Sequence, residues 1–163
     1  MKLRIGIDPG AGGAIAYRYG DDLVCTMNMP DTITDLWDEL DALSNDEYNM
    51  MCALERVGSY VSGNSGPSAA KFARHCGNLE MALVGTKIPY VEVLPLKWQT
   101  EIIGKPNYPK IPKDAPNRKK ILSDRKRDRK NKIKQTMQSL YPHIKVTLKN
   151  ADALGILTYL ERS

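Results

Sequence analysis

The sequence predicts an α/β fold built on a mixed β-sheet. Three short runs with strand-like alternation come first, joined by tight turns, which favours antiparallel pairing. Later, apolar strand-like runs alternate with segments of helical periodicity, a pattern typical of parallel pairing. With no internal repeat and no second domain in evidence, we expect a single domain over residues 1–163.

Each element follows from local composition. The first strand ends at Asp8 and enters the glycine-rich turn PGAGG, and Gly20-Asp21-Asp22 predicts a hairpin. Strands are expected at residues 3–8, 14–19, 23–27, 50–57 and 90–94. Helices are expected after Pro30-Asp31-Thr32, over 68–84, from Pro95 to about Gly104, over 118–140 and over 151–160. Four prolines between residues 105 and 117 predict an extended loop.

Charge is distributed unevenly along the chain. The formal net charge is +5, yet residues 105–134 hold thirteen Lys or Arg and three Asp, a net +10, which leaves −5 for the rest. A basic stretch on an acidic body is the usual electrostatic footprint of a nucleic-acid partner. The plainer interpretation is a solvated, charge-rich helix.

Composition excludes several classes of protein. Three cysteines without a CxxC pair argue against a disulfide framework or a thiolate zinc site and favour a cytoplasmic location. There is no apolar stretch approaching eighteen residues and no signal-peptide pattern, so we expect no membrane partner.

Three carboxylates stand at places where charge is costly. Asp8 ends the first strand, Glu55 follows the apolar run MMCAL, and Asp152 lies within the apolar stretch ADALGILTYL. Stripping water from a carboxylate costs several kcal/mol, and a shared divalent cation would offset that cost. Oxygen ligands without His or Cys indicate Mg²⁺ or Mn²⁺.

Each carboxylate also has a simpler explanation. Asp8 could stabilise the PGAGG bend, Glu55 could pair with Arg56 or a lysine, and Asp152 could interact with the helix dipole.

Three motifs in order carry a family resemblance: GIDPG with Asp8, LERV with Glu55, and NADALGI with Asp152. With them the chain resembles the RuvC family of Holliday-junction resolvases, within the RNase H-like nuclease superfamily. The resemblance covers nearly the full length, and the small size and basic insertion look more like the bacteriophage branch, so the location would be the cytoplasm of a bacterial host.

The resemblance implies a three-layer fold with a mixed five-stranded sheet flanked by helices. It also implies a homodimer that binds four-way DNA junctions and cleaves two strands symmetrically with two Mg²⁺ or Mn²⁺ ions. Asp8, Glu55 and Asp152 would then be the catalytic metal ligands, with Asp8 bridging both ions.

One position departs from the family pattern. An Asp or His is expected three residues before the last aspartate, on the same helical face, and here Lys149 stands there. An ammonium cannot ligate a metal and repels a dication, so the second ion is expected to bind weakly. Three explanations stay open: a local shift of the alignment, a naturally weakened nuclease, or an engineered substitution.

DNA contacts are expected mainly from the basic segment. The candidates there are Arg118, Lys119, Lys120, Arg125, Lys126, Arg127, Arg129 and Lys130. Tyr60, in a loop where the family probes the junction centre, and Lys97, on a short helix, are further candidates, whereas Trp98 is expected in the core.

The function predicted is therefore a metal-dependent endonuclease acting on branched DNA. Three alternatives stay open: a junction-binding protein with weakened or absent cleavage because of Lys149, an RNase H-like nuclease acting on RNA hybrids or flaps, and an actin-like nucleotide-binding relative. The last needs a two-lobed architecture for which 163 residues are too few.

Overall fold

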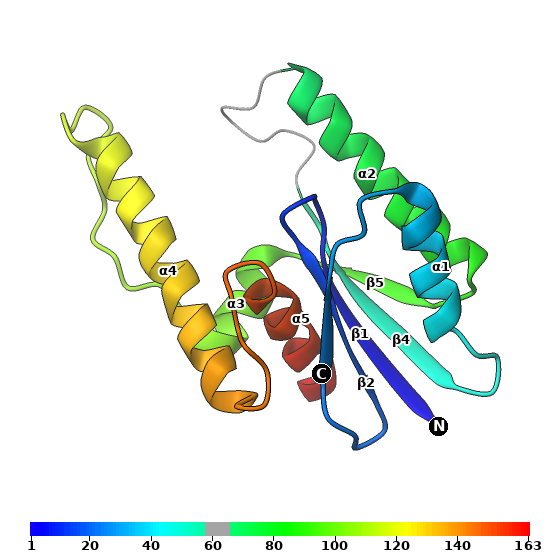
Figure 1. Ribbon diagram of the computed structural model, residues 1–163. Helices are drawn as coiled ribbons and strands as arrows, with labels where there is room; N and C mark the ends of the chain where they lie inside the picture. The colour runs from blue at the N-terminus through cyan, green and yellow to red at the C-terminus, as the bar shows by residue number, and fades with distance from the viewer. Residues whose placement is uncertain (58–65) are drawn as a thin grey trace.

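The computed structural model describes residues 1–57 and 66–163 and contains a five-stranded mixed sheet (Figure 1). Its strand order is β3-β2-β1-β4-β5. The strands are β1 (Lys2–Asp8), β2 (Ala14–Tyr19), β3 (Cys25–Asn28), β4 (Asn49–Glu55) and β5 (Tyr90–Val93). β1 pairs antiparallel with β2, and β2 with β3, while β4 pairs parallel with both β1 and β5. The predicted α/β class with a mixed sheet is confirmed.

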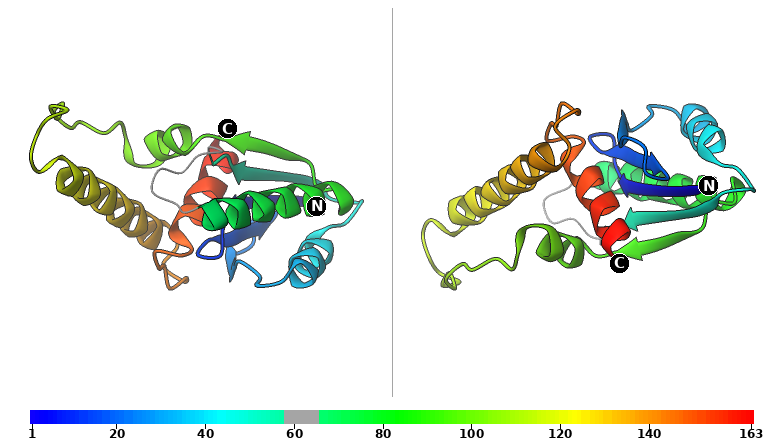
Figure 2. Two further views of the ribbon diagram at one scale, coloured as in Figure 1. Left: turned by 90° about the horizontal axis from the view of Figure 1, so that it is seen from above. Right: turned by 90° about the horizontal axis from the view of Figure 1, so that it is seen from below.

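Helices cover both faces of the sheet, which gives three layers (Figures 1 and 2). They are α1 (Ile33–Leu43), α2 (Gly66–Gly85), α3 (Pro95–Ile103), α4 (Arg118–Leu140) and α5 (Ala151–Arg162). On one face α1 and α2 pack their leucines on Ile5 and Ile7 of β1. On the other face α5 packs on the alanines of β2 and β4, together with Trp98 of α3.

Close packing of β1 on α5 depends on Gly6. A Cβ at this position would overlap the backbone nitrogen of Leu157 and the carbonyl oxygen of Ala153. We expect Gly6→Ala to lower the free energy of unfolding by about 1–3 kcal/mol, because neither backbone atom can move independently. Gly12→Ala is the matched control, since nothing lies within 4 Å of its added Cβ. Urea denaturation measures both; equal stability of the two variants would contradict the packing argument.

Residues 105–132, called here the arm, extend away from the sheet (Figures 1 and 2). α4 is anchored near its C-terminal end, where Ile133 and Met137 are buried. Leu140, the last residue of the helix, lies beyond this buried contact and is 43% exposed.

The proline-rich loop of the arm runs back along α4, held by two arginines. Arg118 Nη1 donates to the carbonyl oxygens of Ile111 (2.9 Å) and Pro112 (3.2 Å), and Arg125 Nη2 donates to that of Pro109 (2.9 Å). The Arg125 guanidinium also lies 4.7 Å from the ring centre of Tyr108. The loop and α4 therefore form one unit.

In the described ranges, no helix combines the length and apolar character that crossing a membrane requires.

Candidate functional site

Asp8, Glu55 and Asp152 come from three elements that meet at one edge of the sheet. β1 and β4 are parallel neighbours in register Ile7↔Leu54, so their last residues, Asp8 and Glu55, lie at the same edge. Asp152 stands in the first turn of α5, which packs against β1, β2 and β4. Before it, the Asn150 side-chain oxygen accepts from the Thr147 backbone N–H (2.7 Å) and fixes the turn that leads into the helix.

These carboxylates interact electrostatically. Burial, then the charges of Asp152 and Glu55, raise the pKa of Asp8 from 3.8 to about 8. Burial and the charge of Asp152 raise the pKa of Glu55 from 4.5 to about 7. Burial raises the pKa of Asp152 as well. Asp8 thus interacts with both other carboxylates, as Asp152 does.

Two further side chains stabilise charge at this edge. The indole Nε1 of Trp98 donates to Glu55 Oε2 at 3.2 Å, and Lys130 Nζ lies 3.8 Å from Asp152 Oδ2. The Asp152 side chain is 13% exposed and that of Lys130 is 46% exposed, so solvent screens this pair from the lysine side. The charge of Lys130 opposes the rise in pKa at all three carboxylates, although burial outweighs it.

A divalent cation fits this group by its donor chemistry. The donors are carboxylates alone, partly buried and mutually repelling, and repulsion of that kind is relieved by a hard cation. As the side chains stand, no three His, Cys, Asp or Glu residues outside 58–65 form a group that could hold an ion. In the part of the chain that the structure describes, the carboxylates are thus electrostatic neighbours without a closed cage, and Lys130 is the positive charge paired with Asp152.

Lys149 is not part of the helix that carries Asp152. α5 begins at Ala151, and Lys149 lies in the preceding turn with an exposed side chain. The lysine that acts on Asp152 is Lys130, which arrives from α4. The argument from helical spacing therefore does not apply to Lys149, because a shared helical face requires both residues to be in the helix, and its role at the site stays a prediction.

The basic candidates of the arm separate into three groups. Lys119, Lys120 and Lys126 are exposed and have no ion-pair partner among the described residues. Arg118 and Arg125 hold the loop, and Arg127 pairs with Asp124 (3.0 Å) and Asp128 (4.0 Å). Arg129 and Lys130 turn towards the body, to Gln99 and Asp152. The charge available to a ligand is therefore smaller than the sequence count suggests.

The remaining candidates have different outcomes. Tyr60 lies outside the described residues. Lys97 is exposed on α3, and its Nζ lies 5.8 Å from the ring centre of Tyr159. Trp98 is fully buried, as expected. Its hydrogen bond to Glu55, 43 residues away, was missed, since nothing local in the sequence signals it.

A sheet of this order, with helices on both faces and acidic residues at the ends of its two central parallel strands, defines the RNase H-like class of fold. The structure is similar to that of Thermus thermophilus RuvC, with a TM-score of 0.59 over 98% of this chain and 95% of that one, at 13% identity. It is also similar to T. thermophilus RuvC in complex with a Holliday junction substrate, with a TM-score of 0.60 over 96% and 91%, again at 13% identity. The RuvC fold is thereby shown. No protein-family model matches the sequence, and the search of curated proteins found no match.

Proposed function

We propose that this protein is a structure-selective endonuclease that binds branched DNA, four-way junctions above all, and hydrolyses phosphodiester bonds with Mg²⁺ or Mn²⁺. The observation that carries the proposal is the meeting of Asp8, Glu55 and Asp152 at one sheet edge, beside a basic arm. Likeness in fold to a RuvC that was solved with a Holliday junction supports the same substrate.

The roles of the residues follow from their positions. Asp8, repelled by both other carboxylates, is the ligand we assign to a position shared by two ions, and Glu55 and Asp152 would each complete one side. Bound divalent ions would supply an activated water and charge stabilisation at the scissile phosphate. The Trp98 N–H holds one oxygen of Glu55, which fixes the orientation of that carboxylate. Lys130 offsets the acidic charge while no cation is bound.

A homodimer acting in the cytoplasm of a bacterial host completes the proposal. A four-way junction presents two equivalent strands to be cut, and a two-fold symmetric dimer matches that symmetry.

Labelled four-way junctions, flaps and RNA–DNA hybrids, each incubated with the wild-type protein and Mn²⁺ or Mg²⁺, test this function. We expect paired cuts in the four-way junction and little product from linear duplex. Preferential cleavage of the hybrid or the flap would replace a junction resolvase with another RNase H-like nuclease.

The second candidate function is junction binding with weakened or absent cleavage. It is favoured by Lys149 and by Lys130, which pairs with Asp152. Lys149→Asp and Lys130→Gln, compared in the same assay, separate the two lysines. Because Lys130 contacts Asp152 and Lys149 is exposed in the turn, we expect Lys130→Gln to tighten Mn²⁺ binding severalfold in calorimetry, while Lys149→Asp changes it little. A large gain of cleavage from Lys149→Asp alone would instead support the expectation drawn from the sequence.

A further inference from the structure

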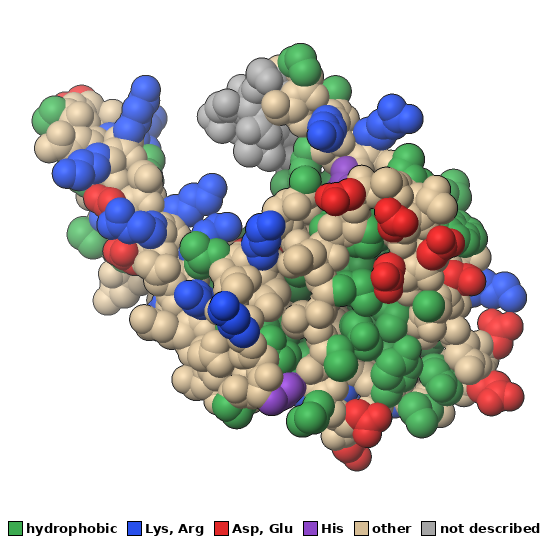
Figure 3. Space-filling model, viewed as in Figure 1, with side chains coloured by type: hydrophobic (Ala, Val, Ile, Leu, Met, Phe, Trp, Pro, Cys, Tyr) green, Lys and Arg blue, Asp and Glu red, His purple; other side chains and the backbone are tan. Residues whose placement is uncertain are grey.

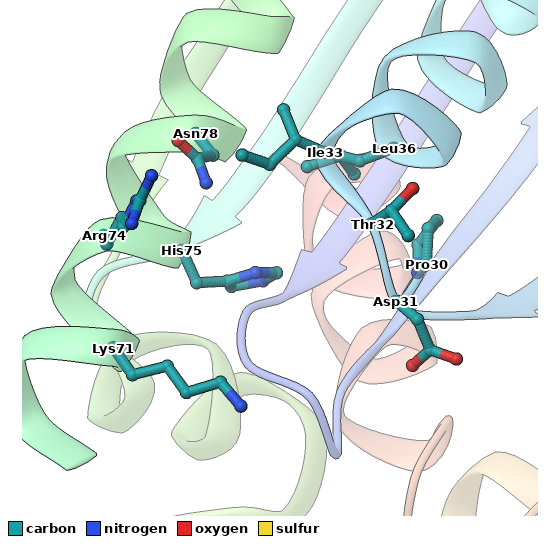
Figure 4. Close-up of a pocket in the computed structure, with 9 residues that line it drawn as sticks. All are labelled: Pro30, Asp31, Thr32, Ile33, Leu36, Lys71, Arg74, His75 and Asn78. Carbon is teal, nitrogen blue, oxygen red and sulfur yellow. The ribbon is translucent and has the colours of Figure 1, made fainter. Parts of the chain in front are cut away.

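An open cavity of about 230 Å³ lies between α2 and the segment that leads from β3 into α1. Lys71, Arg74, His75 and Asn78 line it from α2, and residues 30–33 with Leu36 line it from the other side (Figure 4). Residues 71, 75 and 78 recur at helical spacing, so their side chains share one face of α2. The cavity is separate from the carboxylates and from the arm.

The α2 side of this cavity offers hydrogen-bond donors that have no acceptor among the described residues. Lysine, arginine, imidazole and amide groups all donate. Within the described ranges, no hydrogen bond or ion pair engages the side chains of Lys71, Arg74, His75 or Asn78, and His75 Nε2 is buried with no partner. Asp31 is the one acidic side chain in the lining, and it comes from the opposite wall (Figure 4). Two positive charges and several free donors favour an anion with several acceptor oxygens.

The cavity's place in the fold relates this anion to the candidate active site. A Cβ on Gly10, two residues after Asp8, would lie 3.2 Å from the ring of Phe72, so the start of α2 lies against the turn that follows β1. Lys and Arg side chains gather on the arm on one side of the molecule and on α2 on the other (Figure 3). On α2 these are Lys71 and Arg74.

We propose that the cavity between α2 and the β3–α1 segment binds a backbone phosphate of the DNA, on the side of the carboxylates opposite the arm. The inference rests on the proposed function and deepens it, since it assigns a second contact that holds the DNA. Contacts to the DNA backbone on both sides of the carboxylates, one at the cavity and one at the arm, fix the strand relative to Asp8 more firmly than the arm alone.

The test is the salt dependence of junction binding for Lys71→Ala/Arg74→Ala, measured by fluorescence anisotropy in EDTA. One lost phosphate contact makes the slope of log K against log salt shallower by about 1, and we expect an affinity loss of roughly 10-fold. Lys2→Ala/Lys87→Ala removes the same charge away from the cavity and should leave the slope within about 0.3 of wild type.

The other outcomes overturn the inference in distinguishable ways. If the slope of log K against log salt is the same in Lys71→Ala/Arg74→Ala as in wild type, the phosphate site is overturned and the proposed function stands. If the wild-type protein binds no DNA at all, both are overturned. A change of oligomeric state in light scattering would assign the face to a second copy of the chain. If the His75 ring resonances shift with millimolar inorganic phosphate but not with DNA, the cavity binds free phosphate instead.

Discussion

Asp8→Asn should reduce strand cleavage by a factor on the order of 10³ or more while junction affinity stays within about threefold. Loss of groups that merely orient metal ligands costs 10- to 100-fold, and Asp8 is the central ligand we propose. DNA affinity should persist because the cations of the arm and of α2 are unchanged. Single-turnover cleavage and anisotropy with the same junction measure the two quantities. Cleavage within tenfold of wild type would exclude Asp8 as the shared ligand.

The same substitution should stabilise the metal-free protein, which is an unusual result for a buried side chain. The pKa of Asp8 is about 8 in the folded protein and 3.8 in its ordinary state, so above pH 4 the folded state holds a proton that the unfolded state releases. The stability that Asp8 contributes is present below pH 4 and is lost as pH rises to about 8. Asparagine cannot ionise, so this loss disappears in the variant.

In EDTA, the Tm of Asp8→Asn should therefore match wild type near pH 4 and exceed it progressively up to pH 8. Mg²⁺ should raise the Tm of wild type more than that of the variant, because a bound cation relieves the repulsion in wild type. Asp22→Asn, an exposed aspartate in a hairpin, is the matched control. A lower Tm for Asp8→Asn at pH 8 in EDTA would contradict the electrostatic account.

Local sequence signals predicted the elements of this fold well. The strands and helices follow from apolar periodicity, and the turns follow from glycine and proline, both of which act within a few residues. Asp8, Glu55 and Asp152 were found because a charged residue at the end of an apolar run is costly wherever the run packs.

Contacts between distant segments could not be predicted in this way. Lys130 reaches Asp152 only because Ile133 and Met137 dock α4 on α5, and no spacing in the sequence encodes that docking. Lys149 lies just before the helix that was predicted, and is observed, to begin at Ala151, so the helical spacing to Asp152 does not apply to it. For the segment that holds Lys71 and Arg74 only a helix was predicted, and their common cavity depends on how the β3–α1 segment packs against α2.

Removing the free lysines of the arm, in Lys119→Ala/Lys120→Ala/Lys126→Ala, should weaken junction binding by roughly 10- to 100-fold and make the salt slope shallower by about 2 to 3. These three side chains are exposed and unpaired in the described structure, so each can meet a phosphate without breaking a protein contact. Their replacement should leave the arm intact, since Arg118 and Arg125 still hold the loop. Anisotropy titrations between about 50 and 200 mM salt measure the slope.

A variant that removes acidic instead of basic side chains from the same helix provides the control. Asp124→Asn/Asp128→Asn removes both partners of Arg127 and should tighten binding and steepen the slope, because the guanidinium becomes available to a phosphate. Both variants alter α4 at exposed or half-exposed positions, so a general disturbance of the helix would weaken binding in each. Opposite effects on the slope are therefore the result expected if the arm contacts DNA through its unpaired charges. An unchanged slope in both variants would place the arm away from DNA.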